Sequence, residues 1–346
     1  MAEGQTVQGI DADNVTAWFV EHAPTVAPPL TFELITGGHS NLTFRVTDSA
    51  GTRWVLRRPP LKQVLATAHD MGREARILTA LAPTPVPVPP VVGLCTDEDV
   101  NGAPFYVMEF VDGRVVRNLQ EADALTVEQR RRAGESIVDV LAEIHAVDID
   151  AAGLGDFAKR EDYIARQLKR WYGQFEKSKT REIPVMEEVH TLLAERIPEQ
   201  GPAAIVHGDY RLRQLHAGRG RLARAAVLDW EICTLGDPLA DVGLLMVYWG
   251  DRDAEGAASL PTPTTAVGFP PRPRSSSATP PTRARDLSHV AYYEAFGYWK
   301  LACIIEGVYA RYKGGAMGTR DEGSFDFFGE QVVALAEIAR EAVNRA

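Results

Sequence analysis

The first hundred residues carry short runs in which apolar and polar positions alternate. Such alternation predicts β-strands with one buried face, and the runs here are 31–36 (TFELIT), 42–47 (LTFRVT) and 53–57 (RWVLR). Turns rich in glycine and aspartate separate them. The pattern predicts a meander of three antiparallel strands near the start of the chain.

One helix and two further strands complete this region. Residues 70–81 (DMGREARILTAL) place apolar side chains at helical spacing, and the proline-rich run 83–90 ends them. Residues 91–94 and 105–110 (FYVMEF) again have strand character. We therefore predict an N-lobe of antiparallel sheet plus one helix over residues 1–110.

The remainder of the chain, 111–346, is predicted to form a larger and mainly helical C-lobe. Thr126 is a plausible N-cap ahead of an apolar stripe that ends at Ile144. Two short apolar strands, 204–206 and 225–228, interrupt the helices. Further helices are predicted over 161–177, 186–196, 287–311 and 326–344.

Composition and charge exclude several classes of protein. The 346 residues hold 37 Lys plus Arg against 47 Asp plus Glu, a formal charge of −10, and the basic residues are scattered. This distribution lacks the basic footprint of a nucleic-acid binder. The three cysteines are far apart and in no metal-binding spacing, which argues against disulfides and structural zinc.

The N-terminal sequence lacks the pattern of a signal peptide, and no run of about 18 apolar residues occurs. We therefore predict a cytoplasmic protein without a membrane partner. No feature of the sequence indicates its oligomeric state.

Polar residues that can carry chemistry follow both short strands of the C-lobe. Residues 205–214 (IVHGDYRLRQ) contain His207 and Asp209, and residues 227–231 (VLDWE) contain Asp229. One aspartate can orient a substrate hydroxyl and accept its proton, while a second holds Mg²⁺ against nucleotide phosphates. These two motifs predict phosphoryl transfer.

The motifs upstream support this interpretation by their order. Four features precede the two motifs. They are a glycine-rich hairpin at residues 37–41, a basic residue on the third strand (Arg57), an acid on the helix (Glu74) and a strand end at residues 109–111. A protein-kinase fold uses the same order: phosphate-covering loop, cation, its helix partner, hinge, catalytic loop and metal aspartate. Each motif alone also suits an ordinary turn, strand or helix surface.

The chain resembles the aminoglycoside phosphotransferase and choline kinase-like superfamily over nearly its whole length. HGDYR and residues 228–243 (LDWEICTLGDPLADVG) carry the resemblance. GGHSNLTFRV, VLRRPP, FYVMEFVDG and residues 292–311 are similar to the branch that supplies kinase-like domains fused to acyl-CoA dehydrogenases. The resemblance implies an α+β, bilobal protein-kinase-like fold.

It also implies roles for individual residues. Asp209 corresponds to the catalytic aspartate, and His207 to the histidine that supports its loop. Asp229 corresponds to the aspartate that binds Mg²⁺. Arg57 stands where protein kinases have a phosphate-binding lysine, and it offers a planar fork in place of a point charge. Glu74 would pair with Arg57.

Further residues are assigned by position in the same motifs. The nucleotide would contact the hairpin and the strand end, at Gly37, Gly38, His39, Ser40, Asn41, Glu109 and Val111. The residues that border the site and can select the substrate are Tyr210, Arg211, Trp230 and Glu231. Asp237 and Asp241 are expected to brace the catalytic loop.

The chain departs from the superfamily pattern at two places. The pattern HGDxxxxN has asparagine as a second metal ligand where this chain has Gln214, and glutamine carries its amide oxygen farther out. Residues 259–285 hold seven of the 22 prolines and have the composition of a solvated linker inside a helical lobe.

A single hypothesis covers both departures. Read in a neighbouring frame of suitable codons, residues 212–217 become Leu-Asp-Asn-Cys-Met-Leu, which places asparagine at position 214, and residues 275–282 become helix-forming sequence. Compensated frameshifts would produce this result. The competing hypothesis is a diverged protein with an altered metal site and a real insert.

The sequence thus predicts a kinase that moves the γ-phosphoryl group of ATP, with Mg²⁺, to a hydroxyl of a small molecule. The branch favours a hydroxyacyl or hydroxyacyl-CoA substrate over an aminoglycoside. One alternative is a nucleotide-binding pseudokinase, to which Gln214 points, and a weaker one is a metal-dependent phosphate-ester hydrolase.

Overall fold

The computed structural model describes residues 7–35, 41–61, 70–216, 226–250, 262–272, 286–314 and 325–346. The chain forms two compact units. The first contains Met1–Arg114 and His216–Glu231, and the second contains Val115–Leu215 and Ile232–Ala346. The DWE motif (Asp229–Glu231) therefore belongs to the same unit as the N-terminal sheet. The division of the chain into lobes at 1–110 and 111–346 remains a prediction.

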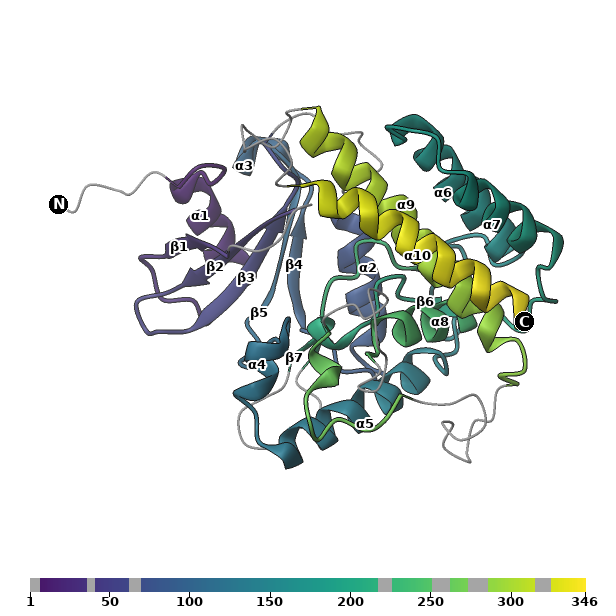
Figure 1. Ribbon diagram of the computed structural model, residues 1–346. Helices are drawn as coiled ribbons and strands as arrows, with labels where there is room; N and C mark the ends of the chain where they lie inside the picture. Colours follow the sequence, from purple (N-terminus) through teal and green to yellow (C-terminus); the bar gives the residue numbers. More distant parts are fainter. Residues whose placement is uncertain are drawn as a thin grey trace. The chain divides into compact units, whose positions relative to one another are not determined.

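A five-stranded antiparallel sheet forms the centre of the first unit (Figure 1). Its strands lie in the order β1-β2-β3-β5-β4. The bounds are β1 Thr31–Leu34, β2 Leu42–Thr47, β3 Arg53–Arg58, β4 Val91–Cys95 and β5 Phe105–Glu109. The predicted meander of three antiparallel strands is confirmed, with Phe44 of β2 opposite Leu56 of β3.

Helix α1 (Ala12–His22) packs on one face of this sheet and was not predicted. The side chain of Asp11 caps it by accepting a hydrogen bond from the Asn14 N–H. Val15, Trp18 and Phe19 follow at helical spacing and share a core with apolar side chains of the strands. The expectation of a single helix against the sheet was therefore wrong.

Helix α2 (Met71–Leu81) is the predicted helix, and Asp70 caps it through the Arg73 N–H. Strand residues alternate between the two helices, because successive side chains point to opposite faces. Phe105 belongs to the core shared with α1, while its neighbour Tyr106 bonds to Glu74 of α2. A short helix, α3 (Glu98–Asn101), joins β4 to β5.

The second unit is mainly helical. Its helices are α4 Leu119–Asp123, α5 Val127–Ile144, α6 Tyr163–Ser178, α7 Pro184–Glu195, α8 Leu239–Tyr248, α9 Val290–Lys313 and α10 Asp326–Asn344. Helices α9 and α10 run side by side (Figure 1). As predicted, Thr126 caps α5, and it forms a reciprocal capping box with Gln129.

Short strands carry the two motifs. Strand β6 (Ala204–Val206) precedes the HGD loop (His207–Asp209) and pairs with β9 (Thr234–Gly236) in the second unit. Strand β8 (Ala226–Val227) precedes the DWE motif and pairs with β7 (Leu215–His216). The 3₁₀ turn η1 (Leu212–Gln214) follows the HGD loop. Both motifs thus follow strands, as predicted.

Residues 262–272 of the proline-rich segment pack into the second unit, and here the expectation of a solvated linker was wrong. They contain the 3₁₀ turn η2 (Pro263–Thr265), and Phe269 is 2% exposed. The Trp249 indole N–H donates to the Pro270 carbonyl at 3.2 Å. The buried side chains of this stretch are those of Thr262, Thr264, Ala266 and Phe269. The rest of 259–285, including the predicted helix near residue 275, lies outside the described residues.

The helices of the described chain are all too short or too polar to cross a membrane.

Candidate active site

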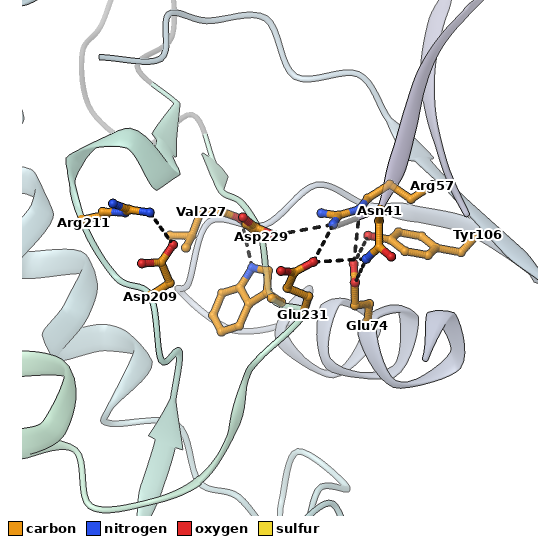
Figure 2. A network of polar contacts seen from close by, with 10 residues as sticks. Asn41, Arg57, Glu74, Tyr106, Asp209, Arg211, Val227, Asp229 and Glu231 are labelled. Atoms are coloured by element: carbon orange, nitrogen blue, oxygen red, sulfur yellow. Dashed lines mark hydrogen bonds and ion pairs between the residues drawn. The ribbon is translucent and has the colours of Figure 1, made fainter. Parts of the chain in front are cut away.

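Arg57 of β3 is the centre of the polar network in the first unit (Figure 2). Its guanidinium lies 3.5 Å from a carboxylate oxygen of Glu74, of Asp229 and of Glu231. Strand β3, helix α2 and the loop after β8 supply these groups. The structure thus brings Arg57 and Glu74 together, as the sequence predicts, and adds two acids of the DWE motif.

Tyr106 and Asn41 fix the acids around Arg57 (Figure 2). The Tyr106 hydroxyl donates to Glu74 at 2.8 Å. The Asn41 side-chain amide donates to Glu74 at 3.0 Å and to Glu231 at 3.2 Å. Asn41 is the last residue of the glycine-rich hairpin, so this amide ties the end of the hairpin to both α2 and the DWE motif.

Burial and charge oppose one another in this network. Burial raises the pKa of Glu74, while Arg57 and the Tyr106 hydroxyl favour its carboxylate form. Burial alone would lower the pKa of Arg57, but the surrounding negative groups hold it above its ordinary value. A fixed positive charge is therefore available beside the carboxylates.

Asp229 has an unusual backbone conformation, with φ of 68°. A non-glycine residue in the left-handed region is strained by about 1–3 kcal/mol, and such strain concentrates at functional sites. The next residue anchors the turn, because the Trp230 indole N–H donates to the Val227 carbonyl at 3.0 Å. The backbone therefore holds Asp229 in one orientation at the end of β8.

In the second unit, Asp209 lies beside Arg211 (Figure 2). The Arg211 guanidinium donates to Asp209 Oδ2 at 2.9 Å and lies 4.4 Å from the centre of the Tyr248 ring. The Asp209 side chain is 25% exposed. An arginine held between a carboxylate and an aromatic face keeps its charge in a fixed place.

Asp241 of α8 braces the HGD loop through the backbone. Its two carboxylate oxygens accept the His207 N–H at 2.7 Å and the Gly208 N–H at 2.8 Å. His145, at the end of α5, contacts the same carboxylate at 3.3 Å. Burial would raise the pKa of Asp241, but these hydrogen bonds and the two histidines hold it below its ordinary value.

The remaining assigned residues have different surroundings. Asp237 accepts the Tyr293 hydroxyl at 2.5 Å and the Leu239 N–H at 3.0 Å, at the start of α8. Tyr210 is fully buried, and its hydroxyl donates to the Ile137 carbonyl at 2.8 Å, so it is a core residue and not a substrate contact. Glu109 ends β5, and Val111 follows it.

Some assigned residues cannot be placed. Gly37, Gly38, His39 and Ser40 lie outside the described residues, and so does the side chain of Gln214. In the described part of the chain, no group of three His, Cys, Asp or Glu side chains is arranged to hold a metal ion.

Sequence reasoning missed three residues of these networks: Tyr106, His145 and Lys300. Lys300 of α9 is buried, and its ammonium donates to the Gly208 carbonyl at 2.9 Å. Tyr106 stood in a strand with apolar neighbours, and His145 directly followed an apolar helical stripe. A charged residue inside the apolar segment 292–305 was the available signal for Lys300.

A family model covers most of the chain, and curated relatives match it along part of their length. The model of the "Phosphotransferase enzyme family" matches residues 31–260. Acyl-CoA dehydrogenase family member 10 of Mus musculus is 34% identical over 312 residues, which are 87% of this chain and 28% of the mouse protein. The chain spans less than half the length of the curated relatives it matches.

Solved structures give the same result. A crystal structure from Ralstonia eutropha, described as a "putative aminoglycoside phosphotransferase", is 32% identical, with a TM-score of 0.78 over 97% of this chain and 99% of that one. The GDP complex of aminoglycoside 2'-phosphotransferase-IIIa is 15% identical, with a TM-score of 0.59 over 96% of this chain and 99% of that one. At that identity the second likeness shows the fold alone.

Proposed function

The chain belongs to the phosphotransferase enzyme family, and we propose that it moves the γ-phosphoryl group of ATP to a hydroxyl of a small molecule. One observation carries this proposal: Arg57 is held by Glu74 of α2 on one side and by Asp229 of the DWE motif on the other. A fixed cation beside an acid suited to a metal ion supports a role in phosphoryl transfer.

The residues of the chain divide the chemistry between them. Asp209 accepts the proton of the substrate hydroxyl as that oxygen attacks the γ-phosphorus. Arg57 places positive charge against the phosphate oxygens, where negative charge is redistributed in the transition state. The bond from the γ-phosphorus to the ADP oxygen breaks, so that ADP leaves and a phosphate monoester forms.

Asp229 and Glu231 fit a magnesium ion by their chemistry. Both offer carboxylate oxygens, which Mg²⁺ prefers, and their side chains are 30% and 21% exposed. Asp229 would hold the ion, with residue 214 as the second ligand that the family pattern supplies. Bound Mg²⁺ would neutralise charge on the ATP phosphates.

For the acceptor, we propose a hydroxyacyl group, free or as its CoA ester. Curated relatives at 30–34% identity bear the name of acyl-CoA dehydrogenases. Named aminoglycoside and macrolide phosphotransferases with solved structures are similar at 14–18%, while the Ralstonia eutropha protein described as a "putative aminoglycoside phosphotransferase" is 32% identical, so an aminoglycoside stays in the acceptor screen. The cationic Arg211 beside Asp209 also suits an acceptor that carries carboxylate or phosphate groups.

The test is an acceptor screen with Mg-ATP, followed by ³¹P NMR. Hydroxyacyl-CoA esters, free hydroxy acids, an amino alcohol and an aminoglycoside are compared with an acyl-CoA that lacks the hydroxyl. A phosphate monoester formed only from a hydroxylated acyl compound supports the proposal in full. Phosphorylation of the aminoglycoside instead would contradict the acceptor class.

Gln214 favours a second candidate, the pseudokinase. Measurable Mg-ATP affinity without any phosphorylated product would support it, and phosphate release without ATP would indicate the hydrolase. Resequencing the coding DNA across codons 205–290 distinguishes a true Gln214 from a frameshift. An asparagine at position 214 would remove the reason for the pseudokinase.

A further inference from the structure

Lys300 is a buried cation that the proposed chemistry does not use. Its side chain leaves α9 for the interior of the second unit, where the residue is 6% exposed. The ammonium donates to the Gly208 carbonyl at 2.9 Å and lies 5.3 Å from the centre of the Trp171 ring. Burying an ammonium is costly, so it persists only where partners compensate for the lost water.

The partner is the peptide that joins Gly208 to Asp209, whose carbonyl oxygen accepts from Lys300. Asp241 holds the preceding peptide, because it accepts the Gly208 N–H at 2.8 Å. Gly208 is thus held on both sides, by Asp241 and by Lys300. Gly208 has a φ of 86°, and an added Cβ would lie 3.2 Å from the Ile232 carbonyl oxygen. The position therefore requires glycine, and polar bonds from other elements must fix this peptide.

The same peptide sets the direction of Asp209. The Asp209 N–H belongs to it and donates to His207 Nδ1 at 3.3 Å. Rotation of the Gly208 carbonyl away from Lys300 would turn this N–H and move the Asp209 side chain with it. A misplacement of about 1 Å at a reacting group can cost on the order of 100-fold in rate.

We propose that Lys300 is a positioning residue for phosphoryl transfer: it fixes the Gly208–Asp209 peptide and thereby holds the Asp209 carboxylate in its reactive position. The proposal rests on the proposed function of Asp209. It adds a residue of α9, far along the sequence from both motifs, to the machinery of the reaction.

The charges around Lys300 provide a second readout. Burial lowers the pKa of its ammonium, and the neighbouring Arg170 and Arg211 act in the same direction. The carboxylates of Asp209 and Asp241 oppose this shift. Lys300 therefore loses its proton at a lower pH than an exposed lysine, and the loop loses its charged donor on the alkaline side of the activity profile. An arginine retains its charge there.

The test compares Lys300→Met with Lys300→Arg and with Lys313→Met, a matched substitution at the exposed end of the same helix. We expect Lys300→Met to lower kcat by about 10–100-fold while the KM for Mg-ATP stays within about twofold. A crystal structure of this variant should show the Gly208 carbonyl rotated. Lys313→Met should behave as the wild type.

Wild-type kcat in Lys300→Met, or an unmoved Gly208 carbonyl in its crystal structure, overturns the proposal. If Lys300→Met does not fold, Lys300→Arg decides: its alkaline limb moves to higher pH if the cation acts on the loop, and an unchanged limb overturns the proposal. A wild-type protein without transfer activity would refute the proposed function. In that case the position of the Gly208 carbonyl in the crystal structure of Lys300→Met still tests whether Lys300 fixes this peptide.

Discussion

Tyr106 shows how a single residue can hold a functional ion pair in place. Its hydroxyl is the donor that reaches Glu74 from the sheet, while Arg57 approaches the same carboxylate from the neighbouring strand. Both Tyr106 and Glu74 are buried, so the carboxylate cannot replace a lost donor with bulk water. The position of Arg57 therefore depends on a residue that contacts neither nucleotide nor metal in the proposed reaction.

We expect Tyr106→Phe to lower the free energy of unfolding by about 1–3 kcal/mol, because Glu74 loses a buried hydrogen bond. The effect should be largest at neutral pH and shrink as the pH falls through the raised pKa of Glu74, since a neutral carboxyl loses less when its donor is removed. Urea titrations at several pH values measure it.

Tyr309→Phe is the control for this prediction. The Tyr309 hydroxyl donates at 3.3 Å to Asp326, which is exposed and can be solvated instead. The decrease in the free energy of unfolding for Tyr309→Phe should be well below that for Tyr106→Phe. It should also stay constant as the pH falls through the pKa of Glu74. Equal losses in the two variants would show that the Tyr106 bond has no special weight.

At the scale of elements, sequence periodicity predicted most of the framework. Strand β2 and helix α10 have the predicted bounds, and α5 begins at the predicted cap Thr126. Helix α1 was not predicted, although Asp11 is its N-cap and Val15, Trp18 and Phe19 are apolar residues at helical spacing. Local pattern also could not reveal that residues 262–272 pack, since that depends on partners distant in sequence.

The packing of this proline-rich segment can be tested at Phe269. The residue is 2% exposed, and we expect Phe269→Ala to lower the free energy of unfolding by about 3–5 kcal/mol through lost burial and a cavity. Val267→Ala, at a position 64% exposed, should change it by less than about 0.5 kcal/mol. Denaturant unfolding of both variants measures these changes. Equal and small decreases in the free energy of unfolding would support the interpretation of the segment as a solvated linker.

The candidate site shows the same division between local pattern and tertiary contact. The HGD and DWE motifs, Arg57 and Glu74 could be read from the sequence because each follows or lies on a predictable element. Lys300, His145 and Tyr106 could not, because only the fold brings them to these motifs. Among the residues that position the motifs, Asp241 was assigned from the resemblance, whereas Tyr106, His145 and Lys300 were not.

At the scale of the whole molecule, ligand binding should appear as stability. A ligand that binds only the folded protein at 100 times its Kd adds about 2.7 kcal/mol. We therefore expect Mg-ATP to raise the Tm, with less effect when EDTA removes the metal. Arg57→Met should abolish most of the shift, and Arg45→Met, on the neighbouring strand β2, should retain it. Equal shifts in the two variants would contradict the role of Arg57 in nucleotide binding.

The most direct test of the account is the transfer reaction itself in Asp209→Asn, an almost isosteric change that removes the proton acceptor. We predict that this variant keeps the wild-type free energy of unfolding and Mg-ATP affinity, while kcat for phosphorylation of the acceptor falls by about 10²–10⁴-fold. A variant that still phosphorylates the acceptor at the wild-type rate would contradict the proposed mechanism.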